Sequence, residues 1–199
     1  MILEYDENVQ GEVYYEPDFP RIRYFKDWGR YVLHTEEFGA LKVAIIGGAY
    51  SVDKFYRLQM GYQWFEDEEL TTEEMQECLA ELAIAKYDLI LTHTCPLSVE
   101  PSDLFLPMVD QSTVSKRMEH FLDDLRYCIT WDIWLFGHYH ADRIERPHIE
   151  QFYKDTESLD DILFRWNNYD IAHELDWWLE VSPNFEKKLD NPLEEEIYD

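Results

Sequence analysis

The chain has few basic residues and no long apolar run, and each shortage excludes a class of protein. Its 199 residues hold 17 Lys and Arg against 43 Asp and Glu, which gives a formal net charge of −26. Such a surface repels nucleic acid and anionic membranes, so we expect no direct binding to either. No stretch of the sequence approaches the roughly 18 apolar residues that a membrane-spanning helix needs. The acidity instead favours metal cations and basic partner proteins.

Cysteine is also scarce, and there is no sign of a secretory leader. Cys78, Cys95 and Cys128 are odd in number, lie far apart and form no CxxC motif. This usage is typical of reduced thiols and not of a disulfide scaffold or a cysteine zinc site. The first ten residues, MILEYDENVQ, are acidic and lack the basic start of a signal peptide. We therefore expect a cytoplasmic protein.

Apolar residues, by contrast, are sufficient for a core. They make up 46% of the chain and aromatic residues 16%, and the length suits one domain over residues 1–199. Within it we expect an irregular N-terminal segment (1–40), a βαβαβ core (41–140), and a C-terminal helix with an acidic tail (141–199). In that last part, Ser158 is the expected N-cap of a helix, and Trp177, Trp178 and Phe185 are expected to clasp the domain.

The predicted core alternates strands and helices. The apolar patterns predict strands at 41–46, 87–91 and 131–136, separated by helices at 71–86 and 112–126. The sequence from Thr71 to Glu74 can form a capping box at the start of the first helix. Alternation of this kind predicts parallel strands with helical crossovers, and therefore an α/β fold.

Glycines and histidines follow the three strands of this core. Gly47-Gly48 follows the first strand, His93 the second, and His138 with His140 the third. Because the carboxyl ends of parallel strands meet at one edge of a sheet, we expect these residues to lie together. Imidazole is a common ligand of transition metals. We therefore favour a metal site with His93, His138 and His140 as ligands over a loop with ordinary histidines.

Several segments of this region resemble one enzyme family. THTCP (92–96) and FGHYH (136–140), together with IIGGAYSVDKFYR (45–57), WFEDEEL (64–70) and GHYHADR (137–143), occur in one order. They are similar to the bacterial and phage branch of the calcineurin-like metallophosphoesterases over residues 40–180. The resemblance implies a four-layer α/β/β/α sandwich and a two-metal centre that hydrolyses phosphoesters. It also implies that His93 and His138 ligate one metal and His140 the other.

Other motifs of that family are missing. The sequence contains no Asp-x-His, no Gly-Asp and no Gly-Asn-His, and about 40 residues before the strand at 41–46 are too few for the half that carries them. We therefore expect an incomplete four-layer α/β/β/α sandwich. Without a bridging carboxylate, the three histidines can hold at most one divalent ion (Mn, Fe, Zn or Ni). Waters and a carboxylate such as Asp53 or Asp142 would complete it, and Arg57 is a further accessory candidate.

These expectations leave three hypotheses open. The first is a metallophosphoesterase-like chain, weakly active or inactive alone, whose missing ligands another polypeptide supplies. The second is a catalytically inactive acidic binding protein of phage type, a nucleic-acid mimic that inhibits a basic nucleic-acid-binding effector, as an anti-CRISPR protein does. The third is a remnant without function. In each case half of the sheet is missing, which predicts an exposed edge and apolar face covered by a partner, self-association or a rearranged N-terminus.

Overall fold

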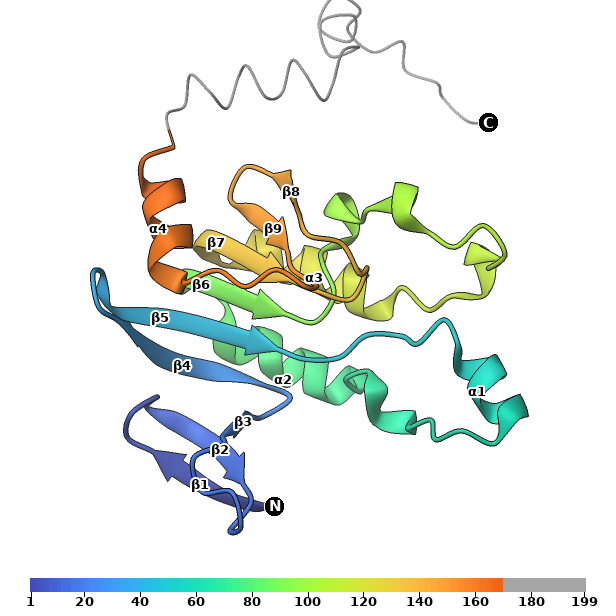
Figure 1. Cartoon of the computed structure of the whole chain (residues 1–199), viewed down its shortest axis with the longest axis horizontal. Coiled ribbons are helices and arrows are strands. Elements are labelled where there is room, and N and C mark those ends of the chain that lie inside the picture. The colour runs from blue at the N-terminus through green and yellow to red at the C-terminus, as the bar shows by residue number, and fades with distance from the viewer. Residues whose placement is uncertain (170–199) are drawn as a thin grey trace, which may run out of the picture.

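A computed structural model describes residues 1–169, which form a mixed α/β structure with two sheets (Figure 1). In the larger sheet β5, β6, β7 and β9 are parallel in that order, and β4 and β8 pair antiparallel at the two edges. The predicted α/β class and the strand–helix–strand–helix–strand core are confirmed. The six strands are β4 (Trp28–Thr35), β5 (Gly39–Ile46), β6 (Lys86–Thr92), β7 (Thr130–Phe136), β8 (Arg143–Arg146) and β9 (Ile149–Gln151).

Two helices, α2 (Thr72–Leu82) and α3 (Arg117–Cys128), pack on the same face of this sheet. The predicted capping box is present: Thr71 Oγ1 accepts from Glu74 N at 3.2 Å, and the Glu74 carboxylate accepts from Thr71 N at 2.8 Å. Each fully buried aliphatic side chain contributes about 1.5–3 kcal/mol to folding. This layer holds the larger of two cores, with Ile46, Cys78, Leu82, Ile90, Met118, Leu122, Leu125 and Trp134 all buried.

The opposite face of the sheet is covered in part by α4 (Leu159–Asn167). Ser158 is its N-cap as predicted, because its hydroxyl accepts from Asp161 N at 3.1 Å. Arg165 ties the helix to β9 through the buried Glu150 at 2.9 Å. The apolar face that we expected a partner or the N-terminus to cover is therefore covered, over these residues, by α4. Its Ile162, Leu163 and Trp166 pack against Leu41, Val43, Leu89, Ile133 and Leu135.

The N-terminal segment is not irregular, and this prediction was wrong. It forms a three-stranded antiparallel sheet of β1 (Ile2–Asp6), β2 (Gly11–Tyr15) and β3 (Tyr24–Phe25), and then β4. The sequences of β2 (GEVYY) and β4 (WGRYVLHT) show no strict alternation of apolar and polar residues, and their buried large side chains are Val13 and Tyr31. Because β4 pairs along the whole of β5, the edge expected to be exposed is occupied. The predicted clasp by Trp177, Trp178 and Phe185 lies outside the described residues.

Two arms project from the edge at which the parallel strands end (Figure 1). The first follows β5 and contains the short helix α1 (Lys54–Met60) and the 3₁₀ turn η1 (Glu66–Glu68). The second follows β6 and contains the 3₁₀ turns η2 (Leu97–Val99), η3 (Ser102–Leu104) and η4 (Gln111–Thr113). Over residues 1–169, no helix is both long enough and apolar enough to cross a membrane.

Candidate metal centre

Backbone hydrogen bonds join the ends of the three central strands. The amide of His93 donates to the carbonyl of Ile46 at 3.1 Å, and the amide of Gly137 donates to the carbonyl of His93 at 3.0 Å. Gly48 has φ +94°, and a side chain there would meet the backbone oxygen of Glu68 at 3.1 Å. Glycine is therefore required where the first arm crosses this edge. The structure brings the glycine pair, His93 and the His138 loop together, as the alternation predicts.

His93 and His138 face each other across this edge. Their ring centroids are 5.2 Å apart and their planes are inclined by 58°. Two imidazoles that share one tetrahedral ion have centroids about 5 Å apart, because each metal–nitrogen bond is about 2.0–2.1 Å long. The pair therefore has the spacing that a single shared ion requires. This donor chemistry suits Zn, Fe, Ni and Mn.

The low pKa values of this histidine pair keep both rings neutral at pH 7. Burial above all, together with the neighbouring His93, His140 and Lys116, lowers the pKa of His138 to about 4. The pKa of His93 is also lowered by desolvation, although part of its ring is exposed, and Glu68 opposes that shift. A neutral imidazole has a free lone pair at pH 7, so neither ring must lose a proton before it binds a metal.

The rings of His138 and His140 have different neighbours, His93 for the first and Tyr153 for the second. His138 and His140 both have left-handed backbone angles, φ 72° and φ 58°, which are uncommon for residues other than glycine. The ring of His140 is exposed and stacks on Tyr153, with centroids 4.5 Å apart. Of the three predicted ligands, His93 and His138 therefore form the close pair, and His140 lies beside it.

A polar network behind the histidines fixes their two loops to each other. The Tyr139 hydroxyl lies 3.0 Å from Thr94 Oγ1 and donates to Glu100 at 3.2 Å. Thr94 Oγ1 in turn donates to the buried Glu119 at 2.8 Å, and Lys116 pairs with Glu100. A strained backbone conformation persists only where surrounding contacts hold it in place. Tyr139 lies between the two left-handed histidines, and its contacts with Thr94 and Glu100 hold this loop.

The accessory candidates have other partners in the described residues. Asp53 pairs with Arg57 at 2.8 Å on the exposed α1, and neither contacts the three histidines. Asp142 accepts hydrogen bonds from the amides of Tyr153 at 2.6 Å and of Lys154 and Asp155, both at 3.1 Å. It thereby holds the loop on which His140 stacks.

Sequence reasoning missed one carboxylate near the histidines. Glu68 lies close enough to His93 to raise its pKa, and Trp64 Nε1 donates to the same carboxylate at 3.1 Å. The surrounding acidic stretch at 62–70 reads as a surface loop, so nothing distinguishes Glu68 there. The fold places Glu68 at this edge because its backbone carbonyl accepts a hydrogen bond from Ala49 N at 3.0 Å. This bond holds η1 against the glycine pair.

The described donors form a partial set. Within residues 1–169, no three His, Cys, Asp or Glu side chains are arranged to hold a metal ion. The spacing of His93 and His138 matches that of two ligands of one ion, with Glu68 near, and residues 1–169 offer no bridging carboxylate for a second ion.

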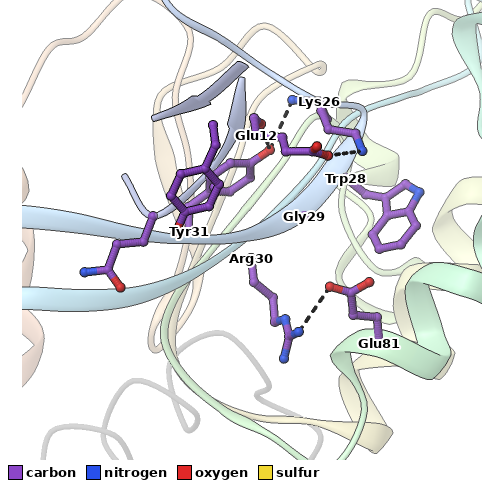
Figure 2. Close-up of a pocket in the computed structure, with 10 residues that line it drawn as sticks. Glu12, Lys26, Trp28, Gly29, Arg30, Tyr31 and Glu81 are labelled. Atoms are coloured by element: carbon purple, nitrogen blue, oxygen red, sulfur yellow. Dashed lines mark hydrogen bonds and ion pairs between the residues drawn. The ribbon is translucent and has the colours of Figure 1, made fainter. Parts of the chain in front are cut away.

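Two hollows in the described part lie elsewhere, at the seam between the two sheets. One has a volume of about 400 Å³ and a neighbouring one about 440 Å³, and both are lined by Gln10, Arg30 and Tyr31. Figure 2 shows that the charges of the first are paired internally, Lys26 with Glu12 at 3.1 Å and Arg30 with Glu81 at 3.2 Å. None of the predicted site residues lines either hollow.

Comparison of the chain with protein-family models, with curated proteins and with solved structures found no match. The metallophosphoesterase resemblance thus stays a prediction from the sequence motifs. The structural basis for a function is the histidine edge, the strand ends that carry His93, His138 and His140.

Proposed function

We propose that the chain is a metallophosphoesterase-like protein in which His93 and His138 bind one divalent ion, with His140 and Glu68 beside it. The observation that carries this proposal is the 5.2 Å separation of the two imidazole rings. It is supported by the neutral state of His138 and by the buried network that fixes both loops. The expected ion is Mn, Fe, Zn or Ni, which nitrogen donors suit.

The residues present support binding better than turnover. A bound divalent ion of this class polarises a phosphoryl oxygen and activates water. His93 and His138 would hold it at the strand ends, and Tyr139 would keep them in place. We propose that the large sheet with α2 and α3 is the surviving α/β half of an incomplete four-layer α/β/β/α sandwich. Further carboxylate ligands would then come from another polypeptide, in the cytoplasm, and this chain alone would hydrolyse phosphoesters weakly or not at all.

Metal stoichiometry and affinity test the site directly. Isothermal titration with Mn²⁺ and Zn²⁺ should show one ion per chain, and elemental analysis should find the same ratio after loading and desalting. His138→Ala and His93→Ala should each weaken binding at least tenfold, because removal of even an outer partner of a ligand costs 10- to 100-fold. His140→Ala should have the smaller effect of the three.

The exposed His34, which pairs with Ala40 at the opposite end of β5, is the matched control. His34→Ala should bind metal as the wild type does. Equal affinity of His138→Ala and His34→Ala would refute the site. For activity, hydrolysis of bis(p-nitrophenyl) phosphate with Mn²⁺ should be weak, and any activity should disappear in His138→Ala. Equal rates in these two proteins would refute a metal-dependent phosphoesterase.

A second candidate, the acidic binding protein, is favoured by the net charge of −26. In this case the chain would mimic a nucleic acid and inhibit a basic nucleic-acid-binding effector, such as a target of anti-CRISPR proteins. Its binding should weaken steeply as salt rises, because exposed charges are screened. Absence of binding to basic nucleic-acid-binding proteins at low salt would refute this candidate.

A further inference from the structure

The first projecting arm exposes apolar side chains that contribute nothing to the described cores. The helix α1 contains no buried residue, although its sequence, KFYRLQM, is largely apolar. Phe55 alone leaves 67% of its surface exposed. A helix of a folded domain normally buries one apolar stripe, so this helix lacks its packing partner. We name residues 52–65 the α1 arm; its exposed large apolar residues are Val52, Phe55, Tyr56, Leu58, Met60, Tyr62 and Phe65.

The second arm adds to this surface. Leu106 and Met108 lie between η3 and η4, and Met108 is 97% exposed. Both arms leave the sheet at the edge where β5 and β6 end, and both project on the same side of the molecule (Figure 1). That edge also carries His93 and His138. Exposed apolar groups gathered on one side of a soluble domain mark an interaction surface, whereas single ones do not.

The charges around the arms indicate what kind of partner fits. Asp67, Glu68 and Glu69 follow the α1 arm, and Asp110 follows Leu106 and Met108 in the second arm. Asp103 is already paired with Arg143, and the arm's own Arg57 is paired with Asp53. The chain as a whole carries −26, so two copies brought together at this surface would repel each other. A partner with an apolar centre and a basic rim would be attracted and would match both features.

We propose that the α1 arm, together with Leu106 and Met108, docks a partner protein through an amphipathic, basic surface of that partner. Bound there, the partner lies over the strand ends that carry the histidine pair. The proposal does not depend on metal binding. In it, the apolar side chains of the two arms select the partner, and the acidic surface as a whole does not.

A model partner tests the surface. The probe is a fluorescent helical peptide of leucine and lysine, about 18 residues or five turns long, with one apolar and one basic face. Anisotropy should report binding that weakens as salt rises. The double substitution Phe55→Ser and Leu58→Ser should weaken it about tenfold or more, because apolar anchors at the centre of an interface carry most of its affinity. The charge of the chain is unchanged by these substitutions.

The matched control is Ile84→Ser with Tyr127→Ser, which removes two apolar side chains that are 99% and 77% exposed away from the arms. This variant should bind the peptide as the wild type does, and circular dichroism should show that both double variants fold like the wild type. Equal affinity of the arm variant and the control, or no binding by the wild type, overturns the proposal. Light scattering that finds a dimer abolished by the arm substitutions also overturns it, because the occupant is then a second copy.

Discussion

The histidine edge and the seam between the two sheets are both rich in charged and aromatic residues, but their interactions differ. At the seam, Lys26 and Arg30 are neutralised by Glu12 and Glu81, and Tyr31 fills the space between two glycines. At the edge, the neutral imidazoles of His93 and His138 face each other, the second on a loop with left-handed backbone angles. The buried Glu119 lies behind them, and its Oε2 has no hydrogen-bond partner. The seam contains hollows of about 400 and 440 Å³, yet its charged groups pair with each other. Unused donors and a fixed backbone are better signs of a site than the size of a hollow.

The largest effect should come from the seam and should be purely structural. Tyr31→Ala removes a buried ring that fits between Gly11 and Gly29, and a hydroxyl that donates to the Glu12 carbonyl at 3.0 Å. Loss of a buried aromatic side chain costs about 3–5 kcal/mol. Chemical denaturation should show this loss, and metal affinity of the folded protein at low denaturant should be unchanged. A loss of metal affinity without a loss of stability would reverse the contrast between the two regions.

At the histidine edge, Tyr139→Phe should cost less stability than Tyr31→Ala but should reduce metal affinity more. Tyr139→Phe removes the hydroxyl between Thr94 and Glu100, and we expect a stability loss of about 1–3 kcal/mol because buried groups lose their partner. Zn²⁺ affinity should fall about tenfold, since groups that orient metal ligands typically contribute 10- to 100-fold. Titration calorimetry and denaturation on the same variant separate the two effects. Unchanged affinity would show that Tyr139 does not position the histidines.

The order of the core could be predicted from sequence because its signals are local. Aliphatic runs, the Thr71 capping box and the Ser158 N-cap each specify their own element. The start of α3 was placed too early, at 112, because Asp110 instead caps the 3₁₀ turn η4 and the helix begins at Arg117. The N-terminal sheet was missed because its buried face depends on long-range packing around Tyr31, which no short window reveals.

The candidate site was predictable in part, for a similar reason. Topology alone placed His93 and His138 at one edge, because strand ends in a parallel sheet converge. Glu68 and Glu119 approach this edge only through turns and helix packing. Asp53 and Asp142 looked equally suitable as ligands, but they bond to Arg57 and to the loop amides at 153–155. The sequence shows that a carboxylate is present, but only the fold shows which groups it bonds to.

A moderate effect should come from the pH dependence of Glu119. Burial raises the pKa of this carboxyl above its ordinary 4.5. Between that value and the raised one, the folded state keeps a proton that the unfolded chain has lost, so the free energy of unfolding falls as pH rises through this window. Glu119→Gln keeps the shape and removes the ionisation. Its stability should therefore depend less on pH in this window and should exceed that of the wild type at pH 7; a variant less stable at pH 7 would contradict this.

The smallest effect should come from the ion pairs of the seam. The Arg30–Glu81 pair is half exposed, with 55% and 46% of the two side chains accessible. Solvent screens such pairs, and they typically contribute about 0–1 kcal/mol. Arg30→Met, which keeps much of the apolar stem, should change stability within that range and leave Zn²⁺ affinity and peptide binding unaffected. A Zn²⁺ affinity reduced as far as in Tyr139→Phe would show that the seam and the histidine edge are coupled through β4 and β5, and the two regions would then have to be treated as one site.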